Sequence, residues 1–361
     1  MRVLLRASES RWLTPVAVLL AVALTLLLTA GPIRLAGANP LAAYTRYTIT
    51  PLSTLTGLSE VLLTATPLVF TGLAVAIAFR VGYFNIGAEG QFLAGTIAAT
   101  LPGLYLPGLP AAVALPLALA AGALGGVVWA LVPAWLKRRA HIDEVVTTLL
   151  LNPVALLLVQ GLLNGPWRNP DTGFPDSERF GAGYDLPAIV AGSRVHWGFG
   201  IAIVLVVITW IVMAHTPLGL RLRAAGQSPD AARFSGIAVT SLQWRSALVS
   251  GGVAGLGGAS QVLGVQHQLT ASISNGYGYT GVVVATLGAL SAGGVLLVAL
   301  LLGDIAVGAQ NASIVLQLPT QMGSIVSSTL LLAVVALLAA RRYRLVFTGR
   351  RRRGRTRRKA E

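Results

Sequence analysis

Long apolar runs alternate with short polar stretches along most of the 361-residue chain. A helix needs roughly 20 mostly apolar residues to cross the hydrocarbon core of a bilayer. The pattern therefore predicts an all-α, polytopic integral membrane helical bundle of about ten transmembrane helices. Their expected ranges are 12–30, 58–79, 84–101, 110–135, 144–163, 197–214, 245–264, 278–292, 294–312 and 321–340. The third and eighth of these segments are short or interrupted by glycine.

The composition supports a membrane protein and narrows its chemistry. Hydrophobic residues make up 55% of the chain and charged residues only 11%, whereas soluble domains carry about 25% charged residues. A chain this apolar must expose most of its surface to lipid. It has no cysteine and four scattered histidines, so we expect no disulfide, no metal site and no cofactor.

The net charge of +15 raises the question of nucleic-acid binding. Eleven of the 27 basic residues lie in one tail, from Arg341 to Lys359. A basic run directly after an apolar span is typical of a cytoplasmic anchor against anionic lipid. We therefore expect membrane lipids, and no nucleic acid, as partners of this tail.

The positions of the basic residues also predict an orientation, because Lys and Arg gather in cytoplasmic loops. With the N-terminus inside and ten alternating spans, 22 of the 27 basic residues fall on the cytoplasmic side. Both termini are then cytoplasmic. A single transmembrane domain, 1–340, would contain an anchor span at 12–30 and a cytoplasmic loop at 215–244, with a basic tail at 341–361. The first span also resembles a signal peptide, but its apolar run is long for one, which favours an uncleaved anchor.

The sequence carries no pattern of a catalytic centre, so we expect no enzyme. Its two lysines, Lys137 and Lys359, lie outside any GxxxxGK[ST] loop, and the chain therefore has no P-loop for ATP. The GxSxG and HExxH patterns are also missing from the sequence.

Glycines instead recur in patterns that favour close packing of helices. The stretch 276–281 fits GxGxxG, but it opens an apolar segment and not a soluble βαβ unit. We interpret its glycines as points where helices approach closely or break at membrane depth. Gly122-xxx-Gly126 and Gly251-xxx-Gly255 predict close helix-packing faces in the same way.

Polar side chains inside an apolar segment are costly unless they face a cavity or a partner. The densest group contains Asn85, Glu89 and Gln91, interspersed with two glycines. Such a stretch suits a broken or pore-facing segment, in which a half-helix end offers free N–H groups to a polar ligand. The alternative is structural: Glu89 pairs with Arg80, and Asn85 caps a helix start.

Two further asparagines extend this group. Asn152 precedes Pro153 within the fifth segment, where it either satisfies the carbonyl that the proline frees or lines a pore. Asn275 stands at the mouth of the eighth segment and, like Asn85, is followed closely by glycines, which hints at a duplicated half. The candidate residues of a substrate pathway are Asn85, Glu89, Gln91, Asn152 and Asn275.

The inner loop contains a predicted short helix at 229–235. Ser228 suits its N-cap, Pro229 its first turn and Asp230 its positive end, and Gly236 follows it. The small and partly apolar surface of this helix favours a docking contact over an ordinary connecting loop. The residues predicted to form that contact are Ser228, Pro229, Asp230, Ala231, Ala232 and Phe234.

Three stretches resemble the permease subunits of bacterial nucleoside ABC importers, which belong to the wider branched-chain amino acid and simple-sugar permease family. The first is 73–91, which ends Asn-Ile-Gly-Ala-Glu-Gly-Gln, and the second is 143–152, Asp-Glu-Val-Val-Thr-Thr-Leu-Leu-Leu-Asn. The third, 223–233, falls at the position of the coupling helix of that family. The resemblance covers 40–340, and the Arg-rich tail after residue 349 departs from it.

The resemblance implies the transmembrane domain of an ABC importer in the bacterial plasma membrane. Its partners would be two cytoplasmic ATPases, a second permease in a heterodimer, and an extracellular lipoprotein that captures nucleosides. The ATPases would grip the helix at 229–235, and their closure would drive alternating access. Acidic groups of the capture protein would meet Arg168, Arg179 and Arg194 of the outer loop.

Two alternatives stay open at this stage. The first keeps the importer and changes its cargo to simple sugars or branched-chain amino acids. The second is an autonomous secondary transporter, in which an ion gradient replaces ATP as the source of energy.

Overall fold

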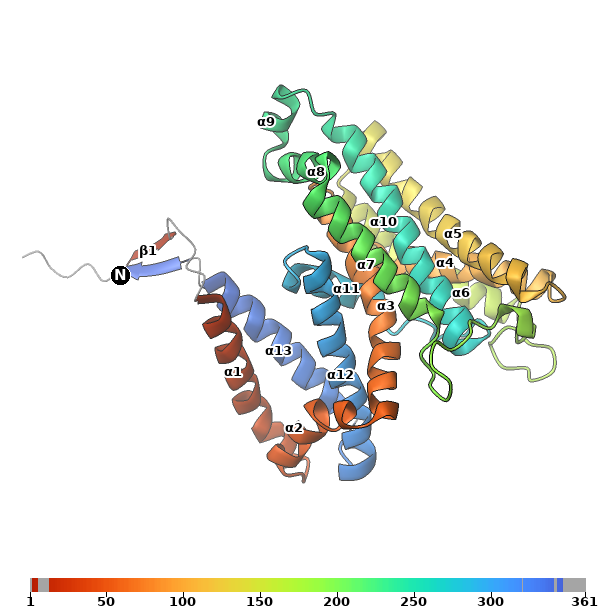
Figure 1. Cartoon of the computed structure of the whole chain (residues 1–361), viewed down its shortest axis with the longest axis horizontal. Coiled ribbons are helices and arrows are strands. Elements are labelled where there is room, and N and C mark those ends of the chain that lie inside the picture. The colour runs from red at the N-terminus through yellow and green to blue at the C-terminus, as the bar shows by residue number, and fades with distance from the viewer. Residues whose placement is uncertain (1, 6–12, 320, 341–342, 347–361) are drawn as a thin grey trace, which may run out of the picture.

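The computed structural model describes residues 2–5, 13–319, 321–340 and 343–346. Apart from two short strands, its regular structure is helical (Figure 1). The strands β1 (Arg2–Leu5) and β2 (Tyr343–Val346) form an antiparallel pair, so the two ends of the described chain lie together. The rest of the predicted basic tail, 341–361, lies outside the described residues.

Helices occupy all ten segments that hydrophobicity predicts, and α2 and α8 are additional. In chain order the helices are α1 (Leu13–Leu35), α2 (Pro40–Thr48), α3 (Leu55–Arg80), α4 (Ala88–Tyr105), α5 (Ala111–Ala140), α6 (Glu144–Asn164), α7 (Trp197–His215), α8 (Pro217–Gln227), α9 (Pro229–Phe234), α10 (Val239–Gln261), α11 (Tyr277–Leu287), α12 (Ala292–Leu316) and α13 (Gln321–Ala340). A π-helical turn, Val262–Gln266, extends α10, and 3-10 turns lie at Pro51–Ser53 and Ala182–Tyr184.

The prediction of about ten spanning helices is not confirmed by helix length. Six described helices are long and apolar enough to cross a membrane, and the bent pair of α1 and α2 makes a possible seventh. The six are α3, α5, α6, α7, α10 and α12. The 11 residues of α11 rise only about 16 Å, roughly half of a hydrocarbon core about 30 Å thick.

The third and eighth segments differ from their predicted ranges because each contains non-helical backbone. Residues 81–87 are irregular, with Gly82 at a φ of +74°, so α4 begins at Ala88 and not at 84. At the other segment, α11 ends at Leu287, and Ala289 and Leu290 adopt left-handed φ values of 53° and 54°. Hydrophobicity alone hides these breaks, because the residues around them are apolar.

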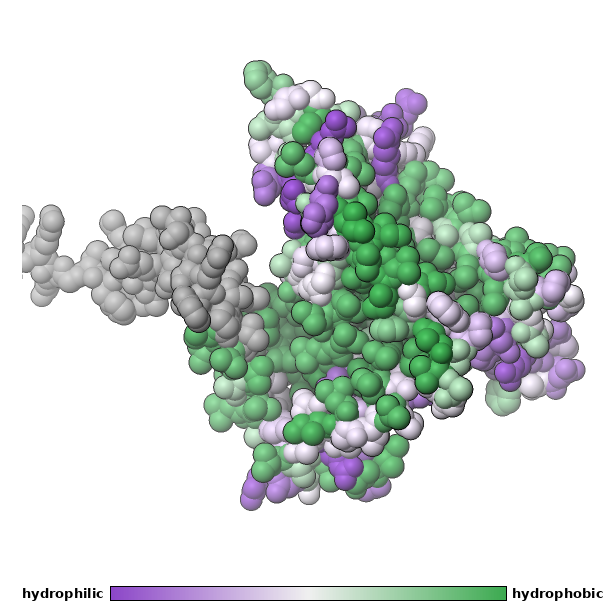
Figure 2. Space-filling model, in the orientation of Figure 1, coloured by the Kyte–Doolittle hydropathy of each residue, from purple (hydrophilic) through white to green (hydrophobic). Residues whose placement is uncertain are grey.

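The centre of the bundle is α3, which is almost wholly buried among α7, α10, α11 and α12. Helices α4, α5, α6 and α10 form one half of the molecule, and α1 and α13 lie side by side at the opposite edge (Figure 1). Hydrophobic residues cover the middle of the visible face, and hydrophilic residues gather at the end with α8 and α9 and toward the opposite end (Figure 2).

Glycine lets α5 and α10 pack with their backbones in contact, as the spacing of the glycines predicts. A Cβ atom on Gly126 would lie 2.1 Å from the carbonyl oxygen of Gly251. One on Gly255 would lie 2.3 Å from the carbonyl oxygen of Gly122. No larger side chain fits at these positions without moving one helix away from the other.

The long connection between α6 and α7 folds back onto the segment that follows α10. Ser177 N donates to the carbonyl oxygen of Leu269 (2.9 Å), and Leu186 N donates to that of Leu263 (3.0 Å). The side chain of Ser177 also accepts from Leu269 N at 2.8 Å. These bonds hold the chain between α10 and α11 from its outer side.

The close approach of α5 and α10 generates a stability prediction. Gly126→Ala should destabilise the chain by about 1–3 kcal/mol, because the added methyl group overlaps a backbone carbonyl group. Gly161→Ala in α6 is the matched control, since no atom lies within 4 Å of its added Cβ. That control should be neutral or stabilising by up to about 1 kcal/mol. The measurement is thermal unfolding of the detergent-solubilised chain followed by size-exclusion chromatography; equal midpoints for the two variants would contradict the packing.

Candidate functional site

The irregular segment between α3 and α4 is held by a closed set of amide hydrogen bonds. Asn85 is fully buried, and its Nδ2 donates to Gln91 Oε1 and to Ser250 Oγ, both at 2.9 Å. Gln91 Nε2 donates back to Asn85 Oδ1 at 3.2 Å. Asn85 Oδ1 also accepts from Gly87 N at 2.9 Å, which turns the chain into the start of α4.

Asn152 attaches the same segment to α6. Its Nδ2 donates to the carbonyl oxygen of Ile86 (3.0 Å), and its Oδ1 accepts from Gly90 N (2.9 Å). Thr148, one turn earlier, accepts from Ile86 N at 3.2 Å. Asn152 lies eight residues after Glu144, the first residue of α6, which places it about 12 Å along the helix. The start of α4 is therefore well inside the bundle.

Glu89 joins the beginnings of two helices that come from different parts of the chain. It lies in the first turn of α4 and is 6% exposed. Its Oε2 accepts from Gly278 N (2.7 Å) in the first turn of α11, and its Oε1 accepts from Ser274 Oγ (2.6 Å). A Cβ on Gly278 would lie 2.0 Å from Glu89 N, so glycine is required for this approach. One carboxylate thus lies at the positive ends of α4 and α11.

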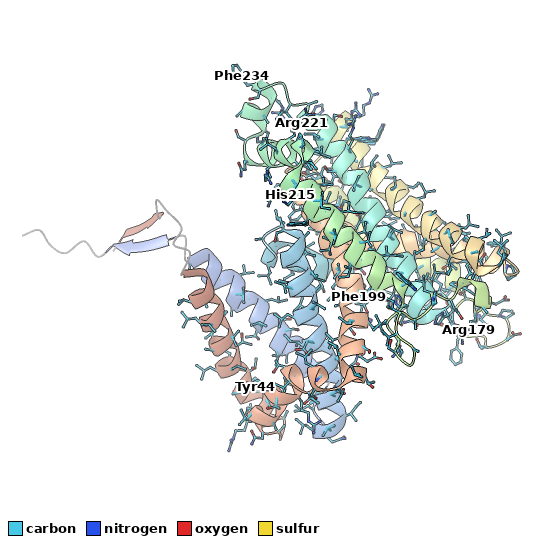
Figure 3. All side chains as sticks on the ribbon, in the orientation of Figure 1. Tyr44, Arg179, Phe199, His215, Arg221 and Phe234 are labelled. Carbon is cyan, nitrogen blue, oxygen red and sulfur yellow. The ribbon has the colours of Figure 1, made fainter. Side chains whose placement is uncertain are left out.

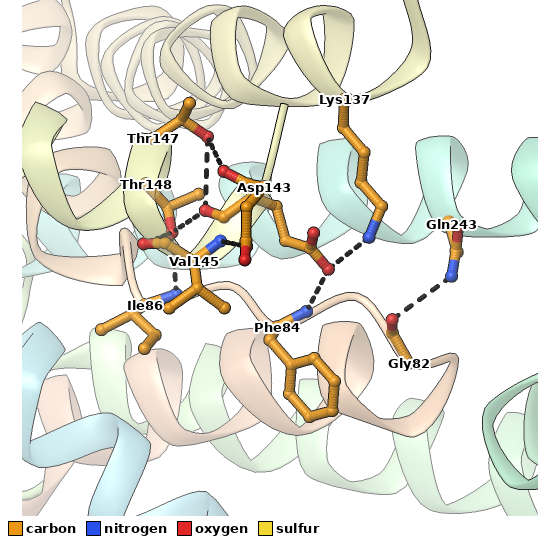
Figure 4. A network of polar contacts seen from close by, with 10 residues as sticks. Gly82, Phe84, Ile86, Lys137, Asp143, Val145, Thr147, Thr148 and Gln243 are labelled. Carbon is orange, nitrogen blue, oxygen red and sulfur yellow. Dashed lines mark hydrogen bonds and ion pairs between the residues drawn. The ribbon is translucent and has the colours of Figure 1, made fainter. Parts of the chain in front are cut away.

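A second buried carboxylate, Glu144, holds the other end of the irregular segment (Figure 4). It forms an ion pair with Lys137 of α5 and accepts from Phe84 N at 3.2 Å. Gln243 of α10 donates to the carbonyl oxygen of Gly82 at 3.2 Å. Helices α6 and α10 therefore each bind the backbone between α3 and α4, and α5 is connected to it through the ion pair of Lys137 with Glu144.

These contacts correct the structural alternatives that the sequence suggests. Glu89 does not pair with Arg80, because its acceptor atoms bind Ser274 and Gly278. The N-cap position of α4 is Gly87 and not Asn85. Asn152 bonds to the neighbouring segment and not to the carbonyl that Pro153 frees.

Sequence reasoning missed several residues that complete this arrangement. They are Lys137, Glu144, Thr148, Ser250 and Ser274. Glu144 could have been found, since a carboxylate that begins an apolar helix needs a partner. The serines carry no such signal, because serine is common in helices of every kind.

The predicted pathway residues fall into two environments. Asn85, Glu89, Gln91 and Asn152 are buried around the start of α4 and are hydrogen-bonded. Asn275 is exposed and adjoins Ser274, the residue that binds Glu89. The site therefore consists of two helix beginnings and a set of amide and carboxylate groups, which can bind a polar solute. Among the described residues, no group of three or more His, Asp or Glu side chains could hold a metal ion.

The predicted docking helix is present as α9, at one end of the molecule. Ala232 faces inward and belongs to the same buried cluster as Val81 and Tyr83, whereas Ala231 is exposed. Phe234 is 97% exposed and lies near the tip of this end (Figure 3). Ser228 occupies the N-cap position without a capping bond from its side chain.

The remaining docking residues, Pro229 and Asp230, begin α9. Asp230 is exposed and forms a 2.6 Å ion pair with Arg233, one turn later in the same helix. Pro229 lies at the first helical position, as its fixed φ favours.

The three arginines of the loop between α6 and α7 differ in the bonds that their side chains form. Arg179 is exposed at the end of the molecule opposite α9 (Figure 3). Arg168 donates to the carbonyl oxygen of Gly173 within its own loop (2.9 Å). Arg194 pairs with Glu60 at the start of α3 (3.2 Å).

His196 ends this outer loop and caps α7. Its Nδ1 accepts from Gly198 N at 3.0 Å. Burial, and to a smaller extent the charges of His267 and Arg194, lowers the pKa of His196 to about 4. The imidazole is therefore neutral near pH 7 and keeps the lone pair that the cap requires.

Comparison with known proteins identifies relatives over most of the chain. The model of the family described as branched-chain amino acid transport system / permease component matches residues 57–335. A glucose ABC transporter permease of Haloferax volcanii is 34% identical over 355 residues, which is 94% of this chain and 92% of the relative. A guanosine ABC transporter permease of Bacillus subtilis is 36% identical over 279 residues, 76% of this chain and 80% of the relative. A nucleoside ABC transporter permease of Lactococcus lactis is 32% identical over 282 residues, 76% and 78% of the two chains.

The shared carboxylate generates a prediction about stability. Glu89→Ala leaves the donors of Ser274 and Gly278 without an acceptor, which costs about 1–3 kcal/mol for each buried group. We expect a clearly lower unfolding midpoint in detergent for this variant. Glu178→Ala, at an exposed loop position, is the control and should leave the midpoint unchanged. If Glu89→Ala unfolds at the same temperature as the control, the carboxylate does not hold the two helices together.

Proposed function

The chain belongs to the permease family of branched-chain amino acid transport systems, and on that premise we propose that it carries nucleosides as the membrane subunit of an ABC importer. The matches to a guanosine permease and a nucleoside permease, at 36% and 32% identity, carry this proposal. ABC permeases leave ATP hydrolysis to a separate subunit, in keeping with a sequence that has no P-loop.

The proposed orientation places α8 and α9 in the cytoplasm of a bacterial cell, at its plasma membrane. The basic residues favour it, since Lys137, Arg138 and Arg139 end α5 on the same side as α9. In this orientation both termini are cytoplasmic. Two further crossings of the membrane would each consist of an extended segment and a helix: segment 81–87 with α4, and the segment before α11 with α11. They bring the number of membrane crossings toward ten.

We assign ATPase docking to α9, because Phe234 is too exposed for a residue with no partner. The inward side of α9 supports a mechanical role. Ala232 belongs to the same buried cluster as Val81 and Tyr83, and these two residues come directly before Phe84, which Glu144 holds. A push on α9 by a closing ATPase would reach the irregular segment through this cluster.

The cargo would pass beside the two helix beginnings that Glu89 joins. Nucleosides are neutral and rich in hydroxyl and amide-like groups, so amide side chains suit them better than fixed charges. Asn275 is exposed and would meet the cargo in this conformation. Asn85, Glu89, Gln91 and Asn152 are buried and would become accessible when the two helices separate.

Two further partners belong to the proposed assembly. An extracellular lipoprotein would deliver the cargo to the outer loop, where Arg179 is the freest of the three arginines and Arg168 and Arg194 are already bonded. A second permease subunit, distinct from this chain, would complete the pore.

A sugar is the second candidate for the cargo, and one observation favours it. The glucose permease of Haloferax volcanii aligns with 94% of this chain, a larger share than either nucleoside relative covers. Both cargoes are neutral and carry hydroxyl groups, so the polar groups of the site do not discriminate between a nucleoside and a sugar.

Competition for uptake distinguishes the two cargoes. We expect proteoliposomes that hold the full complex to accumulate radiolabelled guanosine only with ATP inside. Excess adenosine or uridine should reduce the initial rate at least about fivefold, which corresponds to about 1 kcal/mol of discrimination. Excess glucose or ribose should leave it unchanged. Accumulation of glucose alone would refute the nucleoside proposal, and accumulation without ATP would refute the importer.

A charge on the exposed face of α9 tests the coupling role. Phe234→Asp should leave the unfolding midpoint of the chain unchanged, because the side chain contacts solvent, while ATP-dependent uptake falls to background. Phe174→Asp is the matched control: it makes the same change at an exposed phenylalanine (66%) of the outer loop. That control should still co-purify with the ATPase. Normal uptake by Phe234→Asp would exclude α9 as the docking helix.

A further inference from the structure

 A basic pocket lies at the α9 end of the molecule, beside the Lys137–Glu144 ion pair described above. At about 240 Å³, the cavity falls below the range of about 300–1,000 Å³ that is typical of drug-sized ligands, so it suits a small chemical group. It is lined by the C-terminal end of α5, the chain after α3, Arg233 of α9 and the first turns of α10.

The lining of the pocket is cationic. Lys137, Arg138 and Arg233 all contribute to it, and no Asp or Glu does. Lys137 is paired with Glu144, and Arg233 with the exposed Asp230. Among the described residues, no carboxylate lies within ion-pair distance of Arg138. The pocket thus retains positive charge that its own neighbours do not neutralise.

Two aromatic rings fix the positions of these cations. Lys137 Nζ lies 5.1 Å from the centre of the Tyr83 ring, and the guanidinium of Arg138 lies 5.5 Å from that of the Trp244 ring. Cation–π contacts of this kind orient a charge without neutralising it. The cationic groups are therefore held in place before any ligand arrives, which lowers the entropy cost of binding.

The hydroxyl of Tyr83 is a second, independent indication of a ligand. Tyr83 lines the pocket, its side chain is 2% exposed, and its hydroxyl has no hydrogen-bond partner among the described residues. A buried hydroxyl without a partner is costly, and native structures usually supply one. An oxygen-rich anion in the pocket would accept a hydrogen bond from this hydroxyl and form an ion pair with Arg138.

We propose that this pocket binds a phosphate-bearing anion, through Arg138 and the Tyr83 hydroxyl with Lys137 and Arg233 beside them. Arginine pairs with phosphate through two parallel hydrogen bonds, and a hydroxyl donor adds a third. The phosphate could come from the headgroup of an anionic lipid or from a soluble phosphate monoester. Both sources present negatively charged phosphate oxygens to the pocket.

The test uses the full chain in a neutral detergent at about 0.15 M salt, where long-range attraction between exposed charges is screened beyond roughly 8 Å. The probes are glycerol 3-phosphate, dihexanoyl phosphatidylglycerol and, as the zwitterionic control, dihexanoyl phosphatidylcholine. Binding is measured as the shift of the unfolding midpoint with probe concentration. We expect a saturable rise with at least one anionic probe.

Matched variants assign that binding to the pocket. Arg138→Gln should weaken it about tenfold, which is about 1.4 kcal/mol. Arg139→Gln removes the same charge from the next residue, which is exposed and does not line the pocket, and should leave the affinity unchanged. Tyr83→Phe should weaken binding without any change in charge.

Each outcome of this experiment decides a question. Saturation by glycerol 3-phosphate alone identifies a soluble phosphate as the ligand, and saturation by phosphatidylglycerol alone identifies a lipid headgroup. No saturable shift with either anion, or equal losses in the two arginine variants, would overturn the proposal. Because the test needs neither transport nor a partner, its failure leaves the proposed importer function untouched.

Discussion

The structure depends on one buried carboxylate that serves two helices. Glu89 lies in the first turn of α4 and accepts hydrogen bonds from Gly278 at the first turn of α11 and from Ser274 before it. Two helices that begin inside an apolar bundle expose N–H groups that lipid cannot satisfy. A negative charge at their common end is favourable because both helix dipoles are positive there. This contact supplies the hydrogen bonds that an apolar environment cannot give to the two helix beginnings.

The same arrangement explains how a force at one end could reach the polar site. The chain after α3 is bound to α10 through Gln243, to α5 and α6 through Glu144, and to α6 again through Asn152. Ala232 of α9 shares a buried cluster with Val81 and Tyr83, the first residues of this chain. A displacement of α9 would therefore act on backbone that is held by hydrogen bonds to its neighbours and not by helical structure.

The two ends of the molecule differ in chemistry. The end with α9 gathers basic side chains around a small pocket and leaves Phe234 exposed. The opposite end is a long loop whose backbone pairs with the segment before α11, through Ser177 and Leu186. The residues that this loop contacts therefore come shortly before Ser274 and Gly278, the residues that bind Glu89. Both ends thus connect to the same interior contact, from opposite sides.

The sequence by itself determined the class of the protein, the ten helical segments and the short helix after Ser228, because apolar runs, caps and prolines act over a few neighbouring residues. It also singled out Asn85, Glu89, Gln91 and Asn152. Only the tertiary structure decided what these residues contact, and it replaced the expected pair of Glu89 and Arg80 with bonds to α11. It also decided where helices break within apolar stretches. Those outcomes depend on groups about 190 residues apart in the chain, and local patterns carry no information about such distant partners.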